Sequence, residues 1–303
     1  MEPLDAASVE HRNTLNILYL TIGIIPQSFV YGIYCCLIPH FIFTTVQRGL
    51  QATTRRVMLF VTLYMFIISS IHWISSVVNL IQRFRGWIAD ADGPAAPPVT
   101  YRELLSAVVL TNYFLTDAVV VWRAWVLCND ENKASKVALR ITAVLLSFLA
   151  LSVATTIVIR ILLTIPSRYS KSHNGTLNRA IDVSQTANLG ISLLTNISVI
   201  LIISAKAWKH RRSINQNLPK STRNRRFFMG SRILLVLIES GVLYCFSGVI
   251  TLAALFIRLE FGTLGDLYTL VNFQIAGIYP ILVLLLVNKD RSMDKMIFTA
   301  GLS

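Results

Sequence analysis

Long stretches without charged residues dominate the pattern of polar and apolar positions along this chain of 303 residues. Five runs contain no Asp, Glu, Lys or Arg, and two further runs contain one acid each. An apolar helix of about 20 residues is long enough to cross the hydrocarbon core of a bilayer. The pattern therefore predicts seven membrane-spanning helices. The runs are 13–47, 57–82, 141–159, 183–205 and 267–288, with 104–122 (Asp117) and 233–257 (Glu239).

The predicted fold class is an all-α integral membrane bundle of seven transmembrane helices. The connections between the runs are short, so we expect residues 1–303 to form a single transmembrane domain. Hydrophobic residues make up 54% of the chain and charged residues 14%, which departs from soluble proteins in the direction that a membrane protein requires. The expected helices are 15–46, 57–81, 104–128, 138–164, 180–207, 231–257 and 264–288.

Basic residues show where the chain is expected to meet the cytoplasm. The net charge is +13, and nine of the 28 Lys and Arg residues crowd the segment 206–232. Lys and Arg are enriched in cytoplasmic loops, so we predict that the N-terminus is outside and the C-terminus cytoplasmic, in the plasma membrane or another secretory-pathway membrane. Asn174-Gly-Thr then faces outside as a candidate glycosylation site.

The basic segment 208–230 is expected to be a loop beside the membrane. Its location favours contact with the lipid bilayer or with a cytoplasmic signalling protein over nucleic acid, which we do not expect as a partner. The residues predicted to contact lipid headgroups or a protein partner are Lys209, Arg211, Arg212, Arg223, Arg225 and Arg226.

Polar residues inside the predicted spans mark a candidate ligand site. An ionised Asp117 in a span costs roughly 2.5–3.5 kcal/mol on insertion scales, so it must face the interior, pair or be protonated. Polar stripes at helical spacing run along the fifth and seventh spans. They either line a pocket for an unknown small ligand or join helices by hydrogen bonds. The candidate ligand-binding residues are Asn112, Tyr113, Asp117, Asn188 and Asn272.

Arg123 and Glu239 lie at similar predicted depths near the cytoplasmic ends of the third and sixth spans. Each charge needs a partner in a low dielectric, so we predict an Arg123–Glu239 ion pair that could act as a switch. The alternative is that Arg123 extends to the headgroups alone.

The sequence offers no pattern for catalysis. The five histidines are scattered, and HExxH, GxSxG and Walker-type motifs do not occur. We therefore expect no enzymatic activity, no metal site and no cofactor.

Two segments resemble a known family. They are Asp117-Ala-Val-Val-Val-Trp-Arg-Ala-Trp125 in the third span and Gln274-Ile-Ala-Gly-Ile-Tyr-Pro280 in the seventh. With the overall layout, they resemble a large family of uncharacterised seven-helix membrane proteins of mushroom-forming fungi. The resemblance implies a seven-span bundle and no particular activity. The layout is also loosely similar to G-protein-coupled receptors, although Trp122 rather than an acid precedes Arg123.

Two functions are compatible with these features. The first is a receptor-like protein that senses a small or lipidic ligand and couples to a cytoplasmic partner through 208–230. The alternative is a secondary transporter or channel with Asp117 and Glu239 as ion or proton sites.

Overall fold

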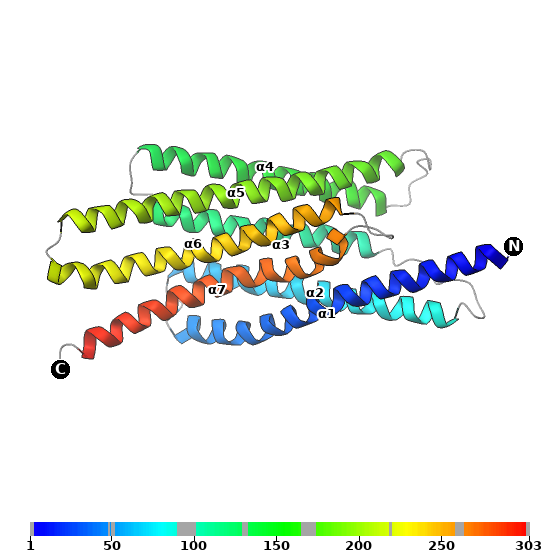
Figure 1. Ribbon diagram of the computed structural model, residues 1–303, viewed down its shortest axis with the longest axis horizontal. Coiled ribbons are helices and arrows are strands. Elements are labelled where there is room, and N and C mark those ends of the chain that lie inside the picture. The colour runs from blue at the N-terminus through cyan, green and yellow to red at the C-terminus, as the bar shows by residue number, and fades with distance from the viewer. Residues whose placement is uncertain are drawn as a thin grey trace.

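Seven α-helices make up most of the chain. The computed structural model describes residues 3–47, 49, 52–89, 101–128, 133–164, 174–217, 220–257 and 264–300, and it describes fewer of the side chains near the helix ends. The helices run side by side along the long axis of the bundle, and α1 begins at the end opposite to the one where α7 finishes (Figure 1). They are α1 (Pro3–Gln47), α2 (Thr53–Ala89), α3 (Tyr101–Cys128), α4 (Lys133–Thr164), α5 (Asn174–Asn217), α6 (Lys220–Phe256) and α7 (Leu264–Ala300).

Each of the seven predicted helices has its counterpart in the structure, but most of them extend beyond the predicted ends. A charge-free run shows only what can lie in hydrocarbon, whereas a helix continues into water as long as its backbone hydrogen bonds persist. The largest correction concerns 208–230. This segment was expected to be a loop, but α5 continues to Asn217 and α6 already begins at Lys220.

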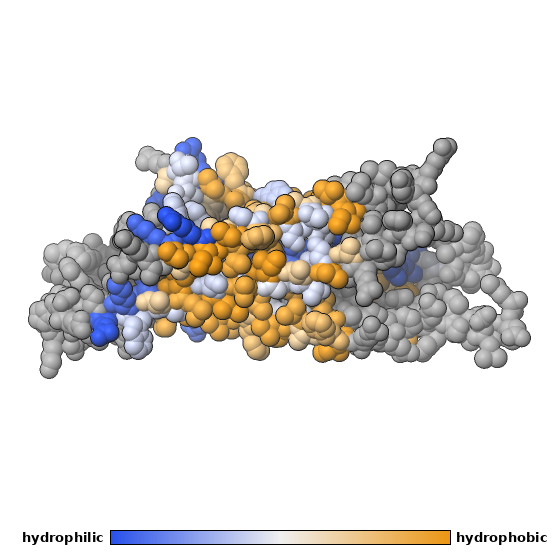
Figure 2. All heavy atoms as spheres, turned by 90° about the horizontal axis from the view of Figure 1, so that it is seen from above, coloured by the Kyte–Doolittle hydropathy of each residue, from blue (hydrophilic) through white to orange (hydrophobic). Residues whose placement is uncertain are grey.

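The bundle has the surface of an integral membrane protein. Within the described residues, six helices are long and apolar enough to cross a membrane. Large apolar side chains such as Phe29, Phe60 and Leu201 are mostly exposed on them, as lipid-facing residues are. Apolar residues fill the middle of the face shown in Figure 2, and hydrophilic residues gather towards the end where α5 and α6 are joined. The six spans are Ile17–Gln47, Thr53–Gly86, Lys136–Arg160, Val183–Lys209, Leu234–Phe256 and Leu267–Leu286.

The remaining helix, α3, is one of the two helices with the most helix neighbours. It contacts α2, α4, α5 and α7, and α7 likewise contacts four helices, whereas α1, α2, α4, α5 and α6 contact fewer. A helix that is surrounded by others needs less apolar surface than one that faces lipid. This explains how α3 can carry Asn112, Asp117 and Arg123 in its described part.

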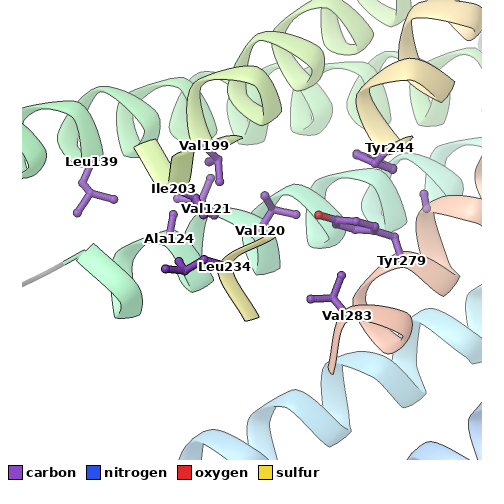
Figure 3. Packing of buried hydrophobic residues seen from close by; sticks show 11 residues of the cluster. Val120, Val121, Ala124, Leu139, Val199, Ile203, Leu234, Tyr244, Tyr279 and Val283 are labelled. Carbon is purple, nitrogen blue, oxygen red and sulfur yellow. The ribbon is translucent and has the colours of Figure 1, made fainter. Parts of the chain in front are cut away.

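Buried apolar side chains hold the end of the bundle around Arg123 together. Val120, Val121 and Ala124 of α3 pack with residues of α4, α5, α6 and α7 in one cluster (Figure 3). Within it, the rings of Tyr244 and Tyr279 stack with centroids 4.9 Å apart, which fixes α6 against α7.

Candidate functional site

Asp117 is fully buried and is bound by α5. The Asn196 side-chain nitrogen donates to Asp117 Oδ1 at 2.7 Å and to the backbone oxygen of Ser192 at 2.9 Å. Asp117 Oδ2 is also buried and has no hydrogen-bond partner among the described protein groups. Asp117 therefore faces the bundle interior, and its Oδ2 atom can accept a further hydrogen bond or bind a cation.

A chain of hydrogen bonds connects α3, α6 and α7 near this acid. Ser247 donates to Asn272 Oδ1 at 2.8 Å, and its hydroxyl lies 3.1 Å from the hydroxyl of Tyr268. The Asn272 side-chain nitrogen in turn lies 3.4 Å from the hydroxyl of Tyr113, which lies 3.5 Å from the backbone oxygen of Thr269. Two of the five predicted ligand contacts, Tyr113 and Asn272, are thus brought together.

The other three predicted contacts, Asn112, Asp117 and Asn188, are not joined to this chain of hydrogen bonds among the described groups. Asn188 donates to Thr156 of α4 at 3.4 Å, so it is turned towards α4 rather than α7. Asn112 is fully buried, and neither polar atom of its amide has a hydrogen-bond partner among the described groups. The five residues therefore do not form one shared pocket, because helix rotation places neighbouring polar positions against different helices.

Two small cavities lie between α3, α5, α6 and α7. The first, of about 10 Å³, is lined by Tyr113, Ser192, Asn196, Tyr244 and Asn272, among others. The second, also of about 10 Å³, adjoins Arg123, Asn196 and Tyr279. A volume of this size holds about one water molecule, whereas drug-sized ligands need several hundred Å³. Asn196 lines both cavities and also binds Asp117, so it is the residue that connects them.

Pro280 creates a specific contact between α3 and α7. Proline has no N–H, so the backbone oxygen of Ala276, four residues earlier, loses its usual donor. The hydroxyl of Thr116 lies 3.0 Å from that oxygen and 2.9 Å from the backbone oxygen of Asn112 in its own helix. The single hydroxyl proton of Thr116 is shared between these two oxygens, so α3 supplies a donor to the carbonyl that proline leaves open.

Arg123 makes the next contact between these helices. Its Nη2 donates to the backbone oxygen of Pro280 at 2.8 Å. The predicted Arg123–Glu239 ion pair is not formed among the described side chains, because Arg123 turns inward to α7 while Glu239 is exposed on the surface of α6. The prediction compared only the depths of the two residues and did not consider the direction in which each helix presents them.

A second polar cluster, which the sequence analysis missed, joins α1, α2 and α7. Gln27 is fully buried with its side-chain nitrogen 3.2 Å from His72 Nδ1, and the His72 ring lies 4.6 Å from the ring of Phe273. Gln274 donates to the backbone oxygen of Ser69 at 3.3 Å. The signal was present, since Gln27, His72 and Gln274 are polar residues within charge-free runs. Because these polar residues are isolated and form no stripe, periodicity did not reveal them.

The predicted partner-contact residues are described only in part. Lys209 and Arg212 are exposed near the end of α5, and Lys206 donates to the backbone oxygen of Leu127 at the end of α3. Such a cation stabilises the carbonyl end of a helix. The side chains of Arg211, Arg223, Arg225 and Arg226 lie outside the described set. The same holds for Asn174, the first residue of α5.

The described residues contain no group of three or more His, Cys, Asp or Glu side chains that could hold a metal ion. Comparison of the chain with models of protein families, with curated proteins and with solved structures finds no match.

Proposed function

We propose that this multi-pass membrane protein is receptor-like and senses a small or lipidic ligand between α3, α5, α6 and α7. The observation that carries the proposal is the series of contacts from α3 to α7. Tyr113, Thr116 and Arg123 reach the backbone oxygens of Thr269, Ala276 and Pro280 in the same order along both helices. A shift of α7 relative to α3 would change all three contacts together.

The small size of the cavities determines how a ligand would act on the helices. A ligand larger than water must separate the helices that line the cavity of Tyr113, Asn196 and Asn272. The binding free energy then favours the separated arrangement, in which α6 and α7 have moved away from α3. In the predicted orientation this movement reaches the cytoplasm at the basic ends of α5 and α6, where a signalling partner would bind.

Photo-crosslinking in cells tests this coupling. A photoreactive amino acid at Ser213, in the extension of α5, should crosslink to a cytoplasmic protein. The variant with Arg223, Arg225 and Arg226 changed to Gln should lose the crosslink, whereas Lys133→Gln with Lys136→Gln serves as a matched control. Asn272→Leu, although it lies far from Ser213, should also change the yield of this crosslink. An unchanged yield in both test variants would refute the proposed coupling.

A secondary transporter or channel is the second candidate, and the partnerless Asp117 Oδ2 is the observation that favours it. Of the two acids expected to form the path, Asp117 is buried and Glu239 is exposed on α6. Purified protein in liposomes with a pH-sensitive dye decides between the two functions. Proton or cation flux that Asp117→Asn abolishes would favour transport over the receptor-like function.

A further inference from the structure

The Arg123 guanidinium forms few hydrogen bonds with the described protein groups. A guanidinium carries five N–H donors and keeps its positive charge in proteins. Nη2 donates to the backbone oxygen of Pro280, whereas Nε and Nη1 are buried and have no hydrogen-bond partner among the described groups. Most of the donor capacity of this cation is therefore not used by the protein groups that the structure describes.

The charge of Arg123 is also not balanced by a described carboxylate. Glu239 is exposed on α6, and Asp117 accepts its hydrogen bond from Asn196. Asp117 also lies six residues earlier in α3, which corresponds to about 9 Å along the helix axis. Arg123 as a whole is half-buried, but its Nε and Nη1 are shielded from water. Shielded donors of a cation without a counter-charge favour an anion.

Arg123 also lines a cavity. This cavity has a volume of about 10 Å³ and lies between α3, α5, α6 and α7. Asn196 and Tyr279 supply further polar groups, and aliphatic side chains such as Val120, Ile203 and Leu237 form most of the remaining wall. A volume close to that of one water molecule excludes phosphate, sulfate and the carboxylate of an organic ligand.

We propose that this cavity binds a single halide ion, chloride in the cell, with Arg123 as its cationic ligand. A halide is larger than water but much smaller than phosphate, sulfate or a carboxylate group, so it needs only a small outward movement of the aliphatic walls. It also needs no directional set of donors, which fits one guanidinium beside such walls. Its charge compensates that of Arg123 in the low dielectric of the bundle. The bound ion holds the guanidinium against Pro280 and so stabilises the contact between α3 and α7. Binding of the ion does not require the receptor-like function, although it acts on one of the α3–α7 contacts on which that function rests.

Thermal unfolding of the full chain in lipid nanodiscs tests the site. Replacing sodium gluconate by sodium chloride at constant ionic strength should raise the Tm of the wild type in a saturable manner, because a ligand that binds only the folded state stabilises it. The rise should be lost in Arg123→Gln and kept in Arg140→Gln, which removes an exposed arginine of α4. Equal Tm values in the two salts, or an equal rise in Arg123→Gln, would overturn the proposal.

A second measurement keeps the proposal testable if Arg123→Gln does not fold. Wild-type protein should broaden the ³⁵Cl NMR line, and bromide should reverse the broadening by competition. Val120→Leu, which fills the cavity without changing a charge, should abolish the specific broadening. Absence of broadening, broadening that bromide does not reverse, or broadening that persists in Val120→Leu would overturn the proposal, because chloride would then not bind specifically in this cavity.

Discussion

The hydroxyl of Thr116 in α3 lies 3.0 Å from the backbone oxygen of Ala276, the carbonyl whose helical donor is missing because residue 280 is proline. Pro280 of α7, which removes the donor, and Thr116 of α3, which supplies one, therefore act as a pair. Pro280 explains why the carbonyl of Ala276 needs a donor, and Thr116 explains how that carbonyl can be buried.

Replacing the hydroxyl of Thr116 should reveal this pairing. Thr116→Val keeps the shape of the side chain but leaves the buried oxygen of Ala276 without its donor. We expect the free energy of unfolding in detergent micelles, measured by titration with a denaturing detergent, to fall by about 1 kcal/mol. In a Pro280→Ala background, which restores the N–H, the same change should cost less. An equal cost in both backgrounds would contradict the pairing.

The hydrogen bond between Asp117 and Asn196 should show strong coupling. Asn196→Leu removes the donor to a fully buried carboxylate, and we expect a loss of about 3 kcal/mol in the free energy of unfolding. The double variant Asp117→Leu with Asn196→Leu should lose less than the sum of the two single changes. Asp117→Asn, which keeps an acceptor oxygen, serves as the control. Additive losses in the cycle would show that the two side chains do not interact.

Gly277 should tolerate no larger residue. A Cβ at this position would lie 2.7 Å from Cε1 of the fully buried Tyr34 and 3.2 Å from Ser69 Oγ, so α1, α2 and α7 would have to move apart. We expect Gly277→Ala to destabilise the protein by about 1–3 kcal/mol. Gly190→Ala is the matched control, because a Cβ there meets nothing within 4 Å. Equal stability of the two variants, read from Tm in nanodiscs, would disprove the tight packing.

Exchanging the charges of Arg123 and Glu239 should give no rescue. Arg123→Glu removes the donor to Pro280 and places an acid beside a backbone oxygen, so we expect reduced surface expression. Glu239→Arg in the same chain should not restore it, because Glu239 lies exposed on α6. Glu239→Gln alone, as the control, should express like the wild type. Recovery in the double variant, measured by labelling of intact cells, would restore the ion-pair hypothesis.

The seven helices could be predicted from the sequence because hydrocarbon imposes a simple rule on backbone and charge. The helix ends could not, since α5 and α6 carry the same lysines and arginines whether they continue as helices or unwind in water. For this reason the segment 208–230 was assigned as a loop, whereas the structure continues both helices into it.

The candidate site was predictable in its parts but not in its connections. The burial of Asp117 followed from its cost in a bilayer, and the polar stripe of α5 contains its partner Asn196. The partner of Arg123 was missed, because two residues at equal depth meet only if their helices present them to each other. The acceptor of Arg123 is moreover the backbone oxygen of Pro280, which carries no formal charge, so a search for opposite charges does not find it.

The uninterrupted length of α5 and α6 has a mechanical consequence. The two helices contain 44 and 37 residues, so they are about 66 and 55 Å long, against about 30 Å for the core of a bilayer. A stiff rod that pivots within the lipid sweeps an arc that widens with distance from the pivot. A tilt of α5 by a few degrees at Asn196 would therefore displace its end at Asn217. The lysines and arginines near that end would move with it, so the helix would act as a lever.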